Sequence, residues 1–384
     1  MRRQFPDGCK LDPSRTTTES LPASRAVRIV GLVIVPLVLV LVLVLLAEGA
    51  VRLRQWTKFG TTASFTDLYR TDERIGLRVL KPNLKVGKVS TNAAGFRGPE
   101  ITQPKPAHTV RLAFLGASTT YCAEVSSDAA VWPQLVVEEL RRRFPETTFD
   151  FVNGGVPGYT VASSRKNLRH RVAALQPDII VVYHATNDLS GEVNELAQQA
   201  GLSEPRPATG PGWLERNSLL WELVAKNLRV MAALRAEKSG SDQRLVVDAS
   251  KLGGNFRNEL ATLLQEATAT GARVAVATFS THLRPGHTAE QQERAAVSAL
   301  VYMPFMSLDG LLVGYARYNE VIVDAARAEH ALLIDGDDLI PGDPIHFVDT
   351  VHFTDQGSLA MAKRVLDALI ADQGIRDLIQ RKRD

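Results

Sequence analysis

Short apolar runs alternate with amphipathic stretches from about residue 110 to the end of the chain. The runs are rich in Val, Ile, Leu and Phe, which is typical of strands buried on both faces of a parallel sheet. The stretches between them repeat apolar residues at three- and four-residue spacings, as helices that cover such a sheet do. The pattern predicts a three-layer α/β/α domain over residues 109–384, with a five-stranded parallel sheet. Its strands are expected near 110–115, 150–153, 179–183, 273–278 and 332–335, and its helices near 130–143, 161–175, 255–270, 313–330 and 356–371.

A different pattern stands near the N-terminus, where Ile29 to Ala47 form an uncharged run of 19 residues, mostly Val and Leu. A helix of this length spans the apolar core of a bilayer. The cleavage signal after the run is weak, so we expect residues 29–49 to be an uncleaved, single-pass transmembrane signal anchor. Basic residues flank both ends, so charge alone leaves the orientation in the membrane open.

Three further segments have weaker patterns. Residues 1–28 are polar and are predicted to form a disordered tail. Residues 50–108 combine short alternating patches with several prolines, which predicts an irregular, β-containing lead-in segment packed on the main domain. Between Asn187 and Arg273 lies more chain than one crossover connection needs. We expect a helical insertion near 190–250, and either a lid over the site or a plain surface insertion would account for it.

Charge and cysteine content exclude some classes of protein. The net charge of +3 over 384 residues is too small to indicate binding to nucleic acid. The two cysteines, Cys9 and Cys122, lie on opposite sides of the predicted membrane span, so we do not expect them to pair. The histidines and acidic residues lack metal-ligand spacing, and no glycine pattern of a phosphate loop is present. We therefore expect no metal and no cofactor, while the oligomeric state stays open.

Candidate chemistry is concentrated near the C-terminus, in the sequence Asp349-Thr-Val-His352. An Asp three residues before a His can accept a hydrogen bond from the imidazole and fix its tautomer. The other ring nitrogen is then free to act as a general base. This spacing is common by chance, so its meaning depends on what a base could act on elsewhere in the chain.

Three upstream strand ends supply what such a base would need. Ser118 follows the apolar run that ends at Gly116, and Gly158 lies in the glycine-rich loop after the second predicted strand. Asn187 follows the third strand. The carboxyl ends of parallel strands meet at one edge of the sheet, so these residues can converge there. A serine hydroxyl, a backbone N–H at a glycine and an amide group would provide a nucleophile and oxyanion donors.

These four motifs, in this order, resemble the SGNH hydrolase superfamily, also called the GDSL-type esterases and lipases. The resemblance covers roughly Val110 to Leu369. It implies the flavodoxin-like fold of that superfamily, Ser118 as nucleophile, His352 as base and Asp349 as the partner that orients the base. It also implies an oxyanion hole formed by the N–H of Ser118 with Gly158 and Asn187.

The chain departs from the family pattern in two places, with Ala117 where the family has Asp and Ala185 where it has Gly. Neither change removes a catalytic atom. Upstream of the domain, the sequence Thr-Asn-Ala-Ala-Gly95-Phe-Arg97-Gly-Pro-Glu100 resembles a motif of membrane-anchored bacterial members.

The resemblance implies ester hydrolysis through an acyl-enzyme on an acylated, O-acetylated substrate outside the cytoplasm. A polysaccharide and a small lipid ester are both candidate substrates. An O-acyltransferase that uses the same three residues is the first alternative, and a non-catalytic glycan-binding or assembly protein is the second. The anchor would hold the catalytic domain at the outer side of the membrane.

Cys122 and His346 compete for these roles in the sequence, and His184 has two alternative placements of its own. Cys122 is an alternative nucleophile, although we expect it to be a small buried residue. His184 could line the pocket or pack beneath it. His346 follows Asp343 at the same three-residue spacing and could replace His352, but the prolines around this pair favour a rigid loop.

Overall fold

The computed structural model describes residues 23–59, 65–202, 214, 217–238, 244–245 and 247–383. The described chain forms two compact units that divide after Leu53, and each is considered by itself. Of the tail expected over residues 1–28, residues 1–22 lie outside the described residues.

The N-terminal helix α1 runs from Ala23 to Phe59, so it begins within the segment expected to be disordered. Among the described residues it is the one helix long and apolar enough to cross a membrane, over Val30–Thr57, and no side chain in this stretch is buried. Ala, Leu and Arg are good helix formers, which explains why the helix extends beyond the apolar run at both ends.

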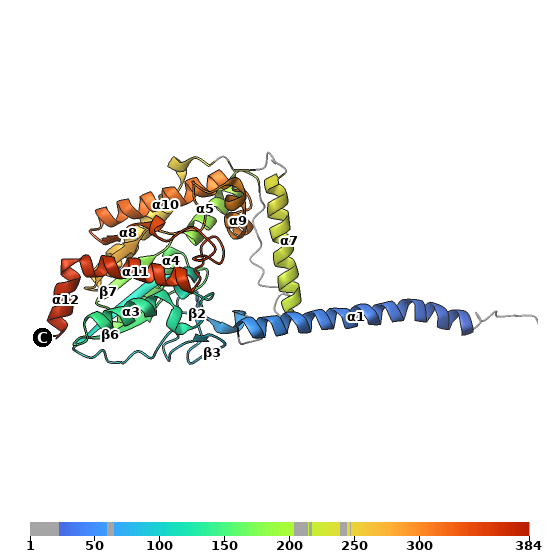
Figure 1. The fold of residues 1–384 in the computed structure, drawn as a ribbon, viewed down its shortest axis with the longest axis horizontal. Helices are drawn as coiled ribbons and strands as arrows, with labels where there is room; N and C mark the ends of the chain where they lie inside the picture. The colour runs from blue at the N-terminus through green and yellow to red at the C-terminus, as the bar shows by residue number, and fades with distance from the viewer. Residues whose placement is uncertain are drawn as a thin grey trace, which may run out of the picture. The chain divides into compact units, whose positions relative to one another are not determined.

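The main unit is built on five parallel strands in the order β6-β5-β7-β8-β9 (Figure 1). This order confirms the predicted sheet and matches the flavodoxin-like arrangement, in which the strand order reverses beside the first strand. The strands are β5 (Thr109–Gly116), β6 (Thr148–Asn153), β7 (Ile179–Tyr183), β8 (Arg273–Ala277) and β9 (Leu332–Ile334).

Helices cover both faces of this sheet, as expected for strands that are apolar throughout. On one face α3 packs against α11, and on the other α8 packs against both α4 and α10. The described helices of this unit are α2 (Ser118–Tyr121), α3 (Trp132–Arg143), α4 (Val161–Asn167), α5 (Thr186–Gln199), α7 (Leu219–Lys238), α8 (Gly254–Ala269), α9 (Ala289–Tyr302), α10 (Leu308–Ala328), α11 (Asp355–Ala371) and α12 (Gln373–Arg383). A π-helical turn, Leu168–Val172, continues α4, and short 3-10 turns span Phe65–Leu68, Asp128–Ala130, Ala173–Leu175, Ala249–Lys251 and Asp337–Leu339.

The lead-in segment forms two small antiparallel hairpins. One pairs β1 (Tyr69–Asp72) with β2 (Leu77–Leu80), and the other pairs β3 (Lys85–Val86) with β4 (Val89–Ser90). Their buried side chains join a second core cluster with residues of the main domain: Ala117, Tyr121, Val156 and Tyr159. The lead-in therefore packs directly beneath the turn that carries Ser118.

Within the range of the insertion expected near 190–250, the structure describes the end of α5 and the helix α7. Helix α7 lies within the expected range and packs against α9. The preceding stretch, 201–212, is rich in Pro and Gly and is expected from its sequence to be a loop; beyond residue 202 it lies outside the described residues.

Candidate active site

Ser118 is presented by the abrupt change from strand β5 to the short helix α2. The strand ends at Gly116, and Ser118 is the first residue of the helix. A Cβ at Gly116 would lie 2.0 Å from Thr120 Oγ1 and 2.9 Å from the Tyr183 carbonyl oxygen, so only glycine fits at this turn. The tight turn leaves Ser118 partly exposed at the carboxyl edge of the sheet, next to the ends of β6 and β7.

His352 and Asp349 lie in the loop before α11 and reach Ser118 from the far end of the chain. His352 Nε2 is 2.8 Å from Ser118 Oγ, across 234 positions of sequence. His352 Nδ1 is 2.8 Å from Asp349 Oδ2. The backbone N–H groups of Val351 and His352 donate to Asp349 Oδ1 at 2.9 and 3.0 Å. The three side chains thus form a continuous hydrogen-bonded series from hydroxyl to carboxylate.

Opposing effects act on the pKa of Asp349. Burial raises it, but the hydrogen bond and charge of His352, together with two backbone N–H donors, outweigh the burial and lower it below the ordinary value. The carboxylate therefore stays ionised near neutral pH. An ionised Asp349 accepts the Nδ1–H of His352 and leaves Nε2 free to accept the proton of Ser118.

Gly158 and Asn187 lie close together, because the Asn187 side chain hydrogen-bonds to the backbone of the residue after Gly158. Gly158 has a φ of +84°, which favours glycine. Asn187 Nδ2 donates to the carbonyl oxygen of Tyr159, the residue after Gly158, at 2.9 Å. The carboxylate of Asp188 accepts from the N–H of Val161 at 3.0 Å, which ties the same loop to α5. Since a primary amide has two N–H groups, Asn187 keeps one for another acceptor.

The competing groups are placed differently. The side chain of Cys122 is buried, and burial raises the pKa of its thiol to about 12, so it does not form a thiolate near neutral pH. His184 is buried with its Nε2 2.7 Å from Ser164 Oγ, and burial lowers its pKa to about 3. His184 is therefore a neutral imidazole that packs beneath the site and does not line the pocket.

His346 repeats the local geometry of His352 without reaching the serine. Its Nδ1 lies 2.8 Å from Asp343 Oδ1, and its backbone N–H donates to the same oxygen at 3.0 Å. Within the described residues, the imidazole beside Ser118 Oγ is that of His352. The two Asp-x-x-His sequences therefore form equivalent local pairs, and only the tertiary fold distinguishes them.

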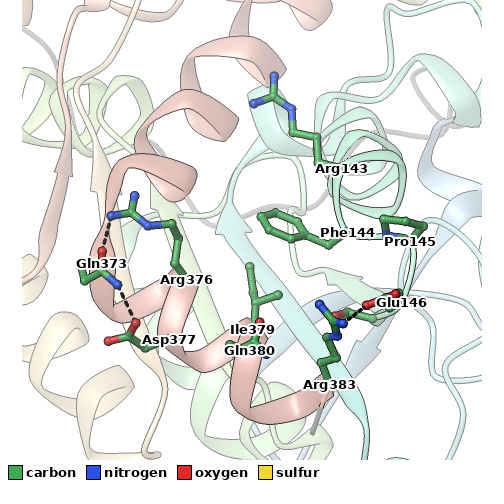
Figure 2. A pocket seen from close by; sticks show the side chains of 11 residues that line it. Arg143, Phe144, Pro145, Glu146, Gln373, Arg376, Asp377, Ile379, Gln380 and Arg383 are labelled. Atoms are coloured by element: carbon green, nitrogen blue, oxygen red, sulfur yellow. Dashed lines mark hydrogen bonds and ion pairs between the residues drawn. The ribbon is translucent and has the colours of Figure 1, made fainter.

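A surface pocket of about 390 Å³ lies at the other edge of the sheet. It is formed where α3 ends and β6 begins, and α12 closes it, with Phe144 and Ile379 at its centre (Figure 2). Arg383 pairs with Glu146 at 2.5 Å, and Arg376 donates to two backbone carbonyls. This pocket opens at the amino ends of the strands, whereas the Ser118 group lies at their carboxyl ends. Among the described residues, no three His, Cys, Asp or Glu side chains are grouped to hold a metal.

Two residues that support the site were not identified as such from the sequence. Asn153, at the end of β6, donates from Nδ2 to the carbonyl of Thr120 at 3.1 Å and accepts from the N–H of Gly155 at 3.0 Å. Arg97 was noted only as part of a motif. A polar residue at the end of an otherwise apolar run was the available signal for Asn153. The contacts of Arg97 are long-range and leave no local pattern.

Comparison with known proteins identifies the family. Residues 114–360, well over half of the chain, match the model of the GDSL-like lipase/acylhydrolase family. No curated protein matches the sequence.

Solved structures similar to this chain have low sequence identity to it. Axe2, an acetylxylan esterase from Geobacillus stearothermophilus, is 15% identical over 67% of this chain and 93% of its own, with a TM-score of 0.40. The acetyl xylan esterase AlAXEase is 14% identical over 68% and 100%, with a TM-score of 0.40. A lipase/acylhydrolase from Enterococcus faecalis is 16% identical over 71% and 96%, also with a TM-score of 0.40. On the family model, the chain belongs to the GDSL-like lipase/acylhydrolase family and is a hydrolase that acts on ester bonds.

Proposed function

We propose that this protein is a serine esterase that works through an acyl-enzyme on Ser118. The observation that carries the proposal is the 2.8 Å contact between Ser118 Oγ and His352 Nε2, with Asp349 behind the imidazole. A serine hydroxyl is a weak nucleophile at its free pKa and needs an adjacent base of this kind. Asp349 orients the imidazole and stabilises its protonated form.

The reaction then follows in two balanced halves. Ser118 Oγ attacks the acyl carbon while His352 Nε2 takes its proton, and the carbonyl oxygen becomes an oxyanion. When the ester C–O bond breaks, the leaving alcohol receives that proton from His352, and the acyl group stays on Ser118. A water molecule then attacks the acyl-enzyme with the same base, which releases the acid and restores the serine.

We assign the oxyanion to three donors: the N–H of Ser118, the N–H of Gly158 and the amide of Asn187. The N–H of Ser118 is the first of a helix, and the first amides of a helix have no acceptor within it. The positive φ of Gly158 and the bond from Asn187 to the Tyr159 carbonyl support a fixed arrangement of the other two. Fixed donors need no reorganisation as the charge develops, which is why they lower the barrier.

The variant Asn187→Ala tests this assignment. We expect the turnover number to fall by roughly 100- to 1000-fold, because one donor to the oxyanion is lost. KM should change little, since the donor acts on the charged intermediate more than on the bound ester. Steady-state kinetics on a short acyl ester measure both. A large rise in KM with an unchanged turnover number would instead place Asn187 in substrate binding.

As the substrate we propose an O-acetylated polysaccharide outside the cytoplasm. Membership in an acylhydrolase family supports an acyl ester, and the apolar helix α1 supports a position at a membrane. The purified full-length protein should release acetate from acetylated polysaccharide and nitrophenol from nitrophenyl acetate. It should hydrolyse nitrophenyl octanoate more slowly. Equal or faster turnover of long-chain esters would favour a lipid substrate. Acetyl transfer to added sugar in place of acetate release would identify a transferase.

We further propose that α1 is a single-pass anchor with the catalytic domain on the extracytoplasmic side. The full-length chain should remain in the membrane fraction after washing with carbonate and high salt, because helix α1 contains an exposed apolar stretch long enough to cross a membrane. Protease added to bacterial spheroplasts should degrade the domain beyond residue 60. Recovery of a soluble chain that begins near Ala50 would identify the segment as a cleaved signal sequence, and a protected domain would reverse the orientation.

A further inference from the structure

The last two carbonyl groups of the turn that carries Ser118 are held by an arginine from the lead-in segment. Arg97 Nη1 donates to the carbonyl oxygens of Tyr121 at 2.7 Å and Cys122 at 2.6 Å. The carbonyls at the end of a helix have no partner within the helix. Because Tyr121 and Cys122 are buried, water does not reach their carbonyl groups, and Arg97 donates the hydrogen bonds instead.

Arg97 is itself fixed from several sides. Its side chain is 1% exposed, and its Nε donates to Asp128 Oδ1 at 2.8 Å. The other carboxylate oxygen of Asp128 accepts the backbone N–H of Ser90 at 2.9 Å, which ties the ion pair to the lead-in. The guanidinium also lies over the ring of Tyr121, 5.1 Å from its centroid. A planar group held by a carboxylate, two carbonyls and an aromatic face has one orientation.

The remaining carbonyls of the turn are bound by residues of the main domain. Trp132 Nε1 donates to Thr119 at 3.0 Å, and Asn153 Nδ2 donates to Thr120 at 3.1 Å. Each carbonyl group from Thr119 to Cys122 is thus bound by a neighbouring side chain, with Arg97 as the contribution from the lead-in.

The motif around Arg97 is built to present this side chain. Asn92 Oδ1 accepts the backbone N–H of Phe96 at 3.0 Å and so closes the preceding turn. Gly95 has a φ of +71°, and a Cβ there would lie 2.7 Å from the carbonyl oxygen of Leu80. Phe96 is buried in the main core, which fixes the next residue against the domain. The motif from Thr91 to Glu100, upstream of the domain, therefore has a structural purpose.

The backbone is strained at the end of the turn, at Cys122, and Arg97 binds the carbonyl group of this residue. Cys122 follows α2 with a φ of +56°, in the left-handed region that non-glycine residues rarely adopt. Such a conformation persists only where surrounding contacts enforce it. The N–H of Cys122 donates to the carbonyl of Ser118 at 2.7 Å, so this strained residue closes the turn on the nucleophile.

We propose that Arg97 is a positioning residue for Ser118, and that the lead-in segment is a structural part of the active site rather than a spacer. The family match begins at residue 114, so it does not include this residue. The catalytic part of this inference rests on the proposed role of Ser118. Without Arg97, two buried carbonyls lose their donor, the left-handed turn at Cys122 relaxes, and Ser118 Oγ moves relative to His352.

The test compares Arg97→Gln with a change at a second buried arginine, which lies at the opposite end of strand β5 from the Ser118 turn. Arg111 is also fully buried, with its Nε donating to Asp150 at 2.7 Å and its Nη1 to the Leu175 carbonyl at 2.8 Å. It lies near the start of β5, away from the nucleophile turn. Arg111→Gln therefore controls for the loss of a buried, ion-paired arginine as such. Arg97→Lys keeps the charge but cannot reproduce the planar fork, and it serves if the glutamine variant does not fold.

We expect Arg97→Gln to lower the turnover number about 10- to 100-fold with KM nearly unchanged, because displacement of a reacting atom by about 1 Å has an effect of this size. The rate at which a fluorophosphonate labels Ser118 should fall in parallel, while Arg111→Gln retains both rates at a temperature where all variants are folded. Arg97→Lys should lie between Arg97→Gln and the wild type. Equal losses in the Arg97 and Arg111 variants, or wild-type kinetics in Arg97→Gln, would overturn the proposal.

Hydrogen–deuterium exchange separates this inference from the proposed function. Peptides that span residues 117–123 should exchange faster in Arg97→Gln than in the wild type, and at the wild-type rate in Arg111→Gln. This result requires no catalytic activity. If the wild-type protein had no esterase activity, the exchange result would still decide whether Arg97 holds the turn, and unchanged exchange would refute the positioning role.

Discussion

Replacing Ser118 with alanine is expected to abolish ester hydrolysis, with a loss on the order of a million-fold in turnover number. The hydroxyl is the one that contacts His352 Nε2, and no acyl-enzyme can form without it. The fold should survive, because the side chain lies partly exposed at a strand end. Hydrolysis of a nitrophenyl ester and labelling by a fluorophosphonate should both disappear, with an unchanged circular dichroism spectrum.

The chain offers a matched control in a second serine that contacts a histidine. Ser164 Oγ lies 2.7 Å from His184 Nε2, but both side chains are buried. Ser164→Ala should retain labelling and activity, although leaving the buried imidazole without its partner costs about 1–3 kcal/mol of stability. Persistent labelling in Ser118→Ala, together with its loss in Ser164→Ala, would transfer the nucleophile to the buried group.

Replacing His352 with alanine should lower the turnover number by a factor similar to that for Ser118→Ala, because the two residues act as a unit. Without the imidazole, nothing accepts the serine proton or returns it to the leaving alcohol. Asp349→Ala should have a smaller effect, since the carboxylate orients the base and stabilises its protonated form without contacting the ester. Turnover of the acetyl ester by each variant, measured at one pH near neutrality, ranks the three residues.

His346 provides the control for this ranking, because it pairs with Asp343 as His352 pairs with Asp349. His346→Ala removes an imidazole from the same loop and the same local geometry, so any effect on folding should be similar. Activity close to that of the wild type is expected. If His346→Ala proved as damaging as His352→Ala, the assignment of the base would have to be abandoned.

Several features of the fold could be predicted because they depend on local periodicity. Strands such as Ile179–Tyr183 are apolar at every position, which indicates burial on both faces, and the structure places them in a parallel sheet as expected. The family resemblance carried by the strand-end motifs is likewise confirmed by the family model. Element boundaries were less accurate: α10 begins at Leu308, five residues before the expected start, and α1 begins at Ala23. Helix ends depend on capping contacts that periodicity does not contain.

The sequence by itself determined the strands, the apolar N-terminal helix and the contact between Asp349 and His352. These are local properties, since three-residue spacing brings two side chains together in one turn wherever that turn lies. Only the tertiary structure distinguished His352 from His346, buried the thiol of Cys122, and connected Arg97 to the turn of Ser118. Those outcomes depend on which strands become neighbours and which side chains lose water, and both are set by packing between segments far apart in the chain.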